Sequence, residues 1–174
     1  METAIVSITL IALIIVGGMT MSQGFLTSVD STMVGVEELS VREGEIMRTE
    51  ITTINATQPA SSSFDLFLRN SGQVKLSSFN KWDVIVKYYK SGSYYVTWLP
   101  YVGGSPGNNQ WTVPGIYLCS ENLTAEVFEP GILNPGEEMI IQAKLSPGIE
   151  KGTTCDVVVS TPNGVSDSFA FVGG

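Results

Sequence analysis

The chain opens with a long, uncharged and mostly apolar segment. No charged residue occurs from Thr3 to Val29, and this run exceeds the ~20 residues that an α-helix needs to cross the hydrocarbon core of a bilayer. β-branched residues fall on nearly all sides of the helix that this pattern predicts. Because a helix that is apolar on every side is buried on every side, we expect it to lie in lipid or at the centre of a multi-helix bundle.

The flanks of this segment do not match a removable secretory signal. Such a signal needs a basic region before its apolar core, whereas Glu2 is the only charge ahead of the segment and the first basic residue is Arg42. An ordinary membrane anchor would also carry basic residues on its cytoplasmic flank. One explanation is that a basic leader preceded Met1 and has been removed, in which case Met1 is the mature N-terminus.

Two adjacent glycines, Gly17 and Gly18, interrupt the apolar run. Each glycine costs an isolated helix about 1 kcal/mol, so we expect a compensating interaction. Small residues let neighbouring helices approach closely, which predicts a helix–helix contact at this point. The predicted helix-packing residues are Ile5, Ile8, Ile11, Ala12, Ile15, Gly17 and Gly18.

After Asp30 the pattern changes from an apolar run to short segments of alternating character. Residues 33–47 have mixed charge and leave strand and helix open. Apolar residues then alternate with polar ones, as at Phe64, Leu66 and Leu68, and this period of two predicts strands. In the segment that starts at residue 82, one side carries Trp82, Val84, Val86 and Tyr88, and the other carries Asp83, Ile85, Lys87 and Tyr89.

Turn residues between the alternating segments predict hairpins. Ser91-Gly92 separates two such segments, and Pro162-Asn163-Gly164 separates the last two. The many Gly, Pro and Asn residues in 101–115 predict a loop. Closely spaced short strands of this kind are typical of an immunoglobulin-like antiparallel β-sandwich. The predicted fold class is therefore α+β, with a hydrophobic N-terminal helix over 1–32 and a β-sandwich over 33–174.

Charge and composition exclude nucleic acid as a partner. The formal net charge is −8 and the isoelectric point is about 4.4, so no basic surface is present to neutralise phosphates. Charged residues make up only 15% of the chain, which is typical of exported β-proteins. In that setting Cys119 and Cys155 are candidates for a disulfide worth roughly 4 kcal/mol. Two buried free thiols are the alternative.

No complete set of catalytic or metal-binding residues is present in the sequence. Gly103–Gly107 spells G-x-S-x-G and Ser78–Lys81 spells S-x-x-K, but the chain contains no histidine, which a nucleophile elbow needs as its base. Glu37-Glu38 and Glu137-Glu138 lack the spacing of a calcium loop. We interpret them as solvated acidic edges, with loop-bound calcium left open. We predict no enzyme activity, no cofactor and no small-molecule substrate.

Two features of the predicted sandwich mark candidate surface sites. Asn55 and Asn122 begin N-x-T sequons and are candidate N-glycosylation sites if the chain is exported. Six aromatic residues also gather in and just after the first hairpin. We expect alternate members in the core and the others at a contact surface. The six are Tyr88, Tyr89, Tyr94, Tyr95, Trp98 and Tyr101.

An apolar helix joined directly to a β-sandwich resembles the archaellins and their type IV pilin-like relatives. FDLFLRNSGQVKLSSFNKWDVIVKYY is similar to that family's strand, Asn-x-Gly turn and next strand, and GILNPGEEMIIQAKLSPG is similar to its late strand. The resemblance implies that a membrane peptidase removes a basic leader and that the helices form the core of a helical filament of identical subunits. It also implies membrane insertion before assembly and an extracellular filament, for motility or adhesion, afterwards.

The same resemblance leaves an alternative open. Bacterial type IV pilins carry a glutamate where this chain has Ile5, so the archaeal type is favoured. Archaellar stator proteins share the helix-plus-sandwich plan, but they stay in the membrane as anchors and contact the surface layer. The alternative to a filament subunit is therefore a membrane-anchored stator or surface-layer-binding sandwich. An anchored adhesive or ligand-binding sandwich, with the Tyr-rich hairpin and 101–115 as its recognition surface, is a third.

Overall fold

Helix and sandwich form two separate compact units. The computed structural model describes residues 2–120, 122 and 124–174. Helix α1 spans Glu2–Arg48, and the division falls inside it, so that unit 1 is Met1–Gly44 and unit 2 is Glu45–Gly174. The segment 33–47, which the sequence left open, is thus helical. The domain boundary between 32 and 33 stays a prediction.

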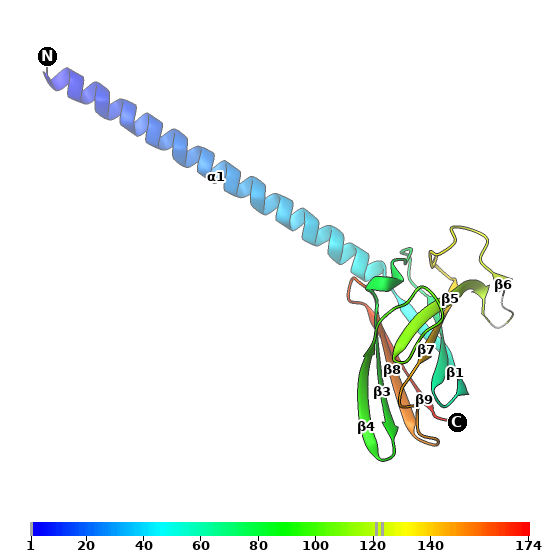
Figure 1. Cartoon of the computed structure of the whole chain (residues 1–174). Coiled ribbons are helices and arrows are strands. Elements are labelled where there is room, and N and C mark those ends of the chain that lie inside the picture. The colour runs from blue at the N-terminus through cyan, green and yellow to red at the C-terminus, as the bar shows by residue number, and fades with distance from the viewer. Residues whose placement is uncertain (1, 121, 123) are drawn as a thin grey trace. The chain divides into compact units, whose positions relative to one another are not determined.

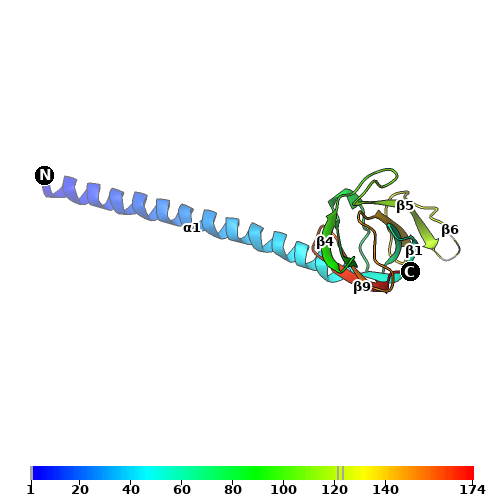
Figure 2. The ribbon, with the colours of Figure 1, turned by 60° about the horizontal axis from the view of Figure 1, so that its bottom comes forward.

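Unit 2 is a sandwich of two antiparallel β-sheets (Figures 1 and 2). One sheet has five strands in the order β1-β2-β7-β5-β6, and the other has four in the order β4-β3-β8-β9. The strands of the first are β1 (Ile51–Ala60), β2 (Ser63–Asn70), β7 (Glu138–Lys144), β5 (Gln110–Cys119) and β6 (Thr124–Ala125). Those of the second are β4 (Ser93–Leu99), β3 (Asp83–Lys90), β8 (Thr154–Ser160) and β9 (Ser166–Val172), with the 3-10 helix η1 (Phe79–Lys81) ahead of β3.

The core lies between the inner faces of the two sheets. Phe64, Leu66 and Leu68 of β2 are fully buried, as their alternation predicts. On the facing sheet Trp82, Val84, Val86 and Tyr88 are all buried, so the predicted grouping of these four residues on one side is confirmed. Each large apolar side chain buried in this way contributes about 1.5–3 kcal/mol. Burial of these alternating rows therefore fixes the register of both sheets.

Two predicted turns are confirmed by the backbone. The β3–β4 hairpin closes from Lys90 to Ser93, with Ser91 at φ 51° and Gly92 at φ 74°. Two central residues with positive φ match the twist of antiparallel strands. The β8–β9 hairpin turns at Gly164, which has φ 89°. We call the end of the sandwich with the first turn the Gly92 end, and the opposite end, where the chain leaves α1, the Thr49 end.

The predicted loop over 101–115 is wrong in its last part. Strand β5 begins at Gln110, because Trp111 belongs to the core and is fully buried. Pro114 fits into this strand because the pairing of β5 with β7 shifts register between Thr112 and Gly115. A bulge of that kind removes the need for a backbone N–H at the proline.

Candidate assembly surfaces

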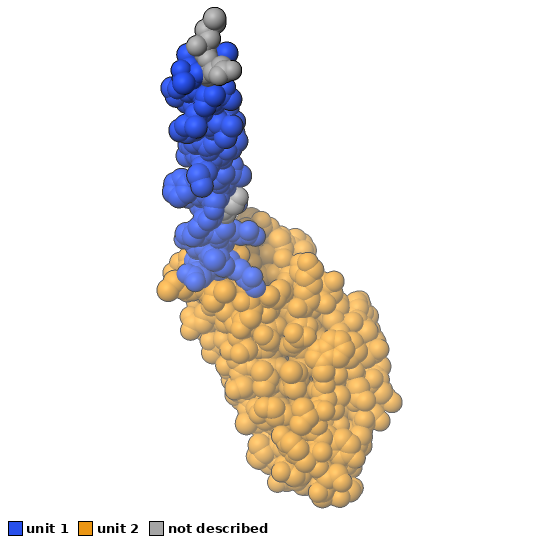
Figure 3. Space-filling view, turned by 90° about the vertical axis from the view of Figure 1, so that its left-hand side faces the viewer, with its two compact units in different colours: residues 1–44 blue, residues 45–174 orange. Residues whose placement is uncertain are grey.

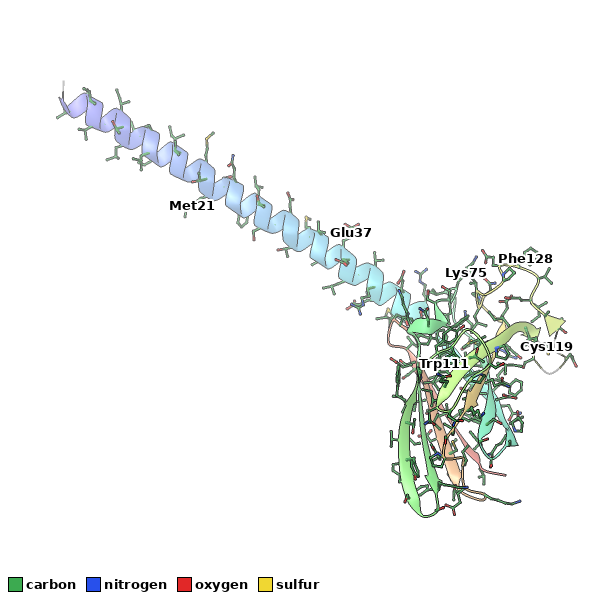
Figure 4. All side chains as sticks on the ribbon, in the orientation of Figure 1. Met21, Glu37, Lys75, Trp111, Cys119 and Phe128 are labelled. Atoms are coloured by element: carbon green, nitrogen blue, oxygen red, sulfur yellow. The ribbon has the colours of Figure 1, made fainter. Side chains whose placement is uncertain are left out.

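The apolar surface of α1 is the largest candidate contact surface of the chain. The large apolar side chains from Ile5 to Leu26 are all exposed. Their exposed fractions range from 56% at Ile15 to 81% at Met21. They project around the helix in Figure 4, where Met21 is labelled. In the described part of unit 1, blue in Figure 3, α1 has no second element to pack against. By length and composition α1 is able to cross a membrane once.

Three hydroxyl groups within this apolar surface donate to carbonyls of the helix itself. The Ser7 hydroxyl donates to the carbonyl of Thr3 at 2.9 Å, and the Thr9 hydroxyl donates to the carbonyl of Ile5 at 2.8 Å. The Thr20 hydroxyl donates to the carbonyl of Gly17 at 2.9 Å. Such bonds to the preceding turn mask polar groups that would be costly in an apolar environment. The helix is therefore suited to lipid or to a packed bundle despite its hydroxyls.

The glycines of α1 have no role inside their own unit. A Cβ atom placed on Gly17 or Gly18 would meet no heavy atom within 4 Å, so the fold of this chain does not require glycine there. Close approach to a neighbouring helix gives both positions a reason to be small. The helix-packing roles of Ile5, Ile8, Ile11, Ala12, Ile15, Gly17 and Gly18 stay predictions.

A second candidate surface lies on the outer side of hairpin β3–β4. Tyr94, Val96 and Trp98 alternate along β4 and are each more than half exposed, and Tyr89 of β3 is 44% exposed beside them. We call these four residues the aromatic face. The other aromatic residues of the hairpin point inward: Tyr88 is fully buried, and Tyr95 packs against the core. The expected alternation is confirmed, and the contact role of the outer members stays a prediction.

Side chains of the aromatic face are held in place before any partner binds. The rings of Tyr89 and Tyr94 lie 5.0 Å apart between centroids. The indole N–H of Trp98 donates to a carboxylate oxygen of Asp83 at 2.8 Å. A surface whose side chains are already ordered loses less conformational entropy when it is covered. The aromatic face is thus an ordered apolar surface along edge strand β4 and the neighbouring part of β3.

A third exposed apolar surface lies in the segment between β6 and β7. Val127 is 72% exposed and Phe128 is 77% exposed, with Glu126 before them and Glu129 after them. The Glu129 carboxylate pairs with the ammonium of Lys75 at 2.5 Å, and Figure 4 labels both Lys75 and Phe128.

The Asn-x-Gly turn after β2, residues 70–72, connects several backbone segments at the Thr49 end. The side-chain amide of Asn70 donates to the carbonyls of Val74 at 2.8 Å and Leu133 at 2.9 Å, and its oxygen accepts from the amide of Gly72 at 3.1 Å. Asn70 is fully buried. Each of these bonds satisfies a group that would be costly to leave unpaired, so the asparagine is required by the fold.

Gly72 ties this turn to the segment that follows α1. The Gly72 amide donates to the carbonyl of Glu50 at 3.0 Å, and the Gln73 amide donates to the carbonyl of Arg48 at 2.8 Å. A Cβ atom on Gly72 would lie 2.5 Å from the Glu50 nitrogen and 2.6 Å from the Arg48 oxygen. Only glycine allows this approach of two backbones. The turn therefore clamps residues 48–50 onto the sandwich.

The β8–β9 turn adds a second tie at the same end. The side-chain amide of Asn163 donates to the Thr49 hydroxyl at 2.7 Å, and that hydroxyl donates in turn to the carbonyl of Glu45 at 2.8 Å. The last turn of α1, within unit 2, is thus connected to both sheets.

The acidic pair at residues 137–138 is buried, so its interpretation as a solvated edge is wrong. Glu138 accepts hydrogen bonds from the Ser120 amide at 2.8 Å and from the Ser120 hydroxyl, and it forms an ion pair with Arg69. Burial alone would raise the pKa of Glu138, but the bonds from Ser120 and Arg69 together hold that pKa below its usual value. The carboxylate joins β7 to the neighbouring strands and is structural.

Cys119 and Cys155 are free thiols in the structure, and only Cys155 is buried, whereas Cys119 is half-buried. Cys119 ends β5 at the Thr49 end of one sheet, whereas Cys155 lies near the Gly92 end of the other sheet. Cys155 is fully buried, and this burial, with a smaller contribution from Asp156, raises the pKa of its thiol to about 12.

The sequon asparagines are accessible. Asn55 lies on edge strand β1 and is exposed, and Asn122 is exposed in a turn. Their glycosylation stays a prediction. Within the described part of the chain, no group of three or more His, Cys, Asp or Glu side chains is placed to hold a metal ion.

Comparison with solved structures decides the fold. The archaeal flagellum of Methanospirillum hungatei strain JF1 is 14% identical, with a TM-score of 0.59, and the match covers 95% of this chain and 90% of that chain. The chain has the archaellin fold. The archaellum periplasmic stator protein FlaG of Sulfolobus acidocaldarius is 21% identical, with a TM-score of 0.51, over 71% of this chain and 99% of that chain.

Archaeal flagellin FlaB1 of Methanocaldococcus jannaschii shares the archaellin fold with this chain at 10% identity and a TM-score of 0.51, over 71% of this chain and 89% of that chain. These relatives by fold are structural archaellar proteins rather than enzymes. A scan of protein-family models and a search of curated proteins each find no match. The resemblance drawn from the sequence is confirmed as a likeness of fold.

Proposed function

We infer that this chain is a subunit of an archaellum-like surface filament and that it polymerises through α1. The observation that carries this inference is the apolar surface of α1, which is exposed on every side, while the hydroxyls of Ser7, Thr9 and Thr20 are bonded to carbonyls of the helix itself. The apolar surface of such a helix is removed from water only when lipid or other helices surround it. Identical subunits are the partners, the membrane holds the chain before assembly, and the assembled filament lies on the cell surface.

The match to the archaeal flagellum supports a filament role for the helix. That match covers 95% of this chain, so it includes most of α1, because unit 2 begins only at Glu45. The helix is therefore part of the shared fold, not an addition to it.

Close packing of helices drives the assembly step. Lipid tails are as apolar as the helix, so association in a membrane depends on van der Waals contact and is strongest where small residues allow close approach. Gly17 and Gly18 supply such a place. When the contact is heterologous and does not close into a ring, it generates a helical filament.

Two substitutions in α1 test this function. Gly17→Leu adds a bulky side chain at the close contact, and Ile11→Asp places a charge in the bundle, so both are expected to abolish filaments while the sandwich stays folded. Ile11→Leu is the matched control and should assemble. The measurement is the amount of chain in filaments sheared from cells, with limited proteolysis to check the sandwich. Normal filament yield from both variants would contradict the proposed function.

A stator role is the second candidate, and sequence identity favours it. FlaG is 21% identical to this chain, whereas the flagellum match is 14% identical. A membrane-anchored stator or surface-layer-binding sandwich would stay with the membrane fraction at few copies per cell. It would form no helical polymer, and Gly17→Leu would leave its location unchanged.

A further inference from the structure

We propose that edge strand β4 pairs antiparallel with β4 of a second copy of this chain, so that two four-stranded sheets form one continuous sheet. The proposal rests on the backbone groups along the outer edge of β4. It goes beyond the proposed function, because the contact joins copies that belong to two different filaments.

Strand β4 has an open hydrogen-bonding edge. It is the last strand of its sheet and pairs with β3 on one side (Figure 1). A two-residue turn joins the two strands, so its closing pair Lys90–Ser93 is hydrogen-bonded, and hydrogen-bonded pairs alternate along the ladder from there. The backbone groups of Tyr94, Val96 and Trp98 therefore point away from β3. Among the described residues, no backbone–backbone hydrogen bond outside the strand ladders involves these three.

The other strand edges of the sandwich are covered or short. The edges β1 and β9 are tied together, because the Thr53 amide donates to a carboxylate oxygen of Asp167 at 2.6 Å and the Gly174 amide donates to the side-chain oxygen of Gln58 at 2.8 Å. Strand β1 also has two register shifts in its pairing with β2. Strand β6, the remaining edge, consists of two residues. Features of this kind keep an edge from pairing with another chain.

Strand β4 has none of these protective features. Its seven residues, SYYVTWL, include no charged residue and no proline, and they pair with β3 without a register shift. Its outward side chains belong to the aromatic face and are exposed. A regular, uncharged and apolar edge is a template for a further strand. The strand that covers it must itself offer an open edge.

Charge favours a second copy of β4 as that strand. Each copy has a net charge of −8, so a contact between copies is most favourable where neither copy contributes an unpaired charge. The charges on the outer face beside β4 have partners in their own chain, since Lys87 pairs with Asp156 and Asp83 accepts from the indole of Trp98. Two copies therefore meet through β4 without opposing like charges.

The residues of β4 also complement each other across a two-fold axis. Antiparallel pairing centred on Val96, the middle of the strand, brings the outward backbone groups of both copies together. It places Val96 opposite Val96 of the second copy and Tyr94 opposite Trp98 of the second copy. Aromatic residues opposite each other on one face of a sheet form favourable cross-strand pairs. The contact thus joins the aromatic faces of both copies into one surface.

The symmetry of this contact determines which copies it joins. Both copies use the same strand, so the contact is isologous and closed. Copies within one helical filament are related by heterologous contacts that repeat without closing. The β4 contact therefore joins the sandwiches of two neighbouring filaments and holds the filaments side by side.

Disulfide formation between filaments tests the contact and its register. The full chain carries a single cysteine in place of Tyr94, Val96 or Trp98, with Cys119 replaced by serine, while the native Cys155 is fully buried. Residues opposite each other in a hydrogen-bonded pair have Cα atoms about 5.5 Å apart, which a disulfide can span. On mild oxidation we expect Val96→Cys filaments to crosslink.

Mixing two filament preparations tests whether the contact lies between filaments. Tyr94→Cys filaments should crosslink with Trp98→Cys filaments after mixing. They should crosslink about tenfold less with themselves, because the two Tyr94 positions would lie about 13 Å apart.

A charged residue at the centre of the contact should separate the filaments. Val96→Lys places two ammonium groups opposite each other, and the exposed position leaves the sandwich folded. Val172→Lys is the matched control, since Val172 of β9 is 66% exposed and Val96 is 59% exposed. In electron micrographs, wild-type and Val172→Lys filaments should lie side by side in bundles. Val96→Lys filaments should form in normal yield and stay separate.

The possible outcomes separate this contact from the proposed function. Three results would overturn the β4 contact and leave the filament function standing: no Val96→Cys crosslink, equal crosslinking of Tyr94→Cys with itself and with Trp98→Cys, or bundles that Val96→Lys leaves unchanged. If the chain enters no filament, the proposed function fails. The detergent-solubilised full chain then decides the pairing of β4, because a disulfide-linked Val96→Cys dimer supports it and the absence of that dimer overturns it.

Discussion

Replacing Gly72 by alanine should destabilise the sandwich by about 3 kcal/mol. A Cβ atom at this position would lie 2.5 Å from the nitrogen of Glu50, 2.6 Å from the oxygen of Arg48 and 3.1 Å from the carbonyl carbon of Thr49. All three are backbone atoms, so no side-chain rotation relieves the clash. Inserting a methyl group into a packed site costs about 1–3 kcal/mol.

The same substitution also weakens hydrogen bonds across the turn. The bonds from Gly72 to Glu50 at 3.0 Å and from Gln73 to Arg48 at 2.8 Å hold the backbones together, and each contributes about 0.5–1.5 kcal/mol. The two costs overlap, because movement that relieves the clash stretches these bonds. A total near 3 kcal/mol corresponds to a fall in melting temperature of about 10 °C for a domain of this size.

Thermal unfolding of the full chain in detergent, followed by circular dichroism of the β-sheet signal, measures this effect. Gly103→Ala is the matched control, because a Cβ atom there meets nothing within 4 Å and its φ is not positive. The control should unfold at the wild-type temperature. If Gly72→Ala also unfolds within about 1 °C of wild type, the turn does not clamp residues 48–50 and the reasoning is wrong.

Two further predictions follow from buried groups of the sandwich. Because the folded-state pKa of Glu138 is lowered below its ordinary value of 4.5, its stabilising contribution is present above that value and is lost as the pH falls through the folded pKa. Glu138→Gln should therefore unfold more easily at pH 7 and show a shallower loss of stability below pH 4.5 than wild type; equal slopes in denaturant titrations would count against this. Cys155, with its thiol pKa raised to about 12, should resist iodoacetamide at pH 8 in the folded chain and react fully after denaturation, which peptide mass spectrometry would show. Rapid labelling of Cys155 in the folded chain would mean that the core is open there.

Much of the sandwich was predictable because its strands obey a period of two. Phe64 and Tyr88 are buried where the alternation places them, and Ser91-Gly92 adopts the positive φ angles that its hairpin needs. Local chemistry was sufficient in these places, since each signal is contained in a few adjacent residues.

Features that depend on distant residues were not predictable. From the sequence alone Glu138 has the pattern of a surface charge, and its burial depends on Arg69 of β2 and on Ser120, the residue after β5. Strand β5 begins in a segment rich in glycine and proline because Trp111 fills the core. The need for glycine at position 72 comes from the backbone of residues 48–50, which lies directly against it. In each case the decisive contact joins segments that are far apart in the sequence.

The measurement that tests the filament role most directly is mass spectrometry of filaments sheared from cells and pelleted. The account predicts that this chain dominates the pellet and that its N-terminal peptide, which contains the apolar run of α1, is recovered with it. Absence of the chain from the pellet, together with its recovery in the membrane fraction, would contradict the filament role and favour a membrane-anchored stator.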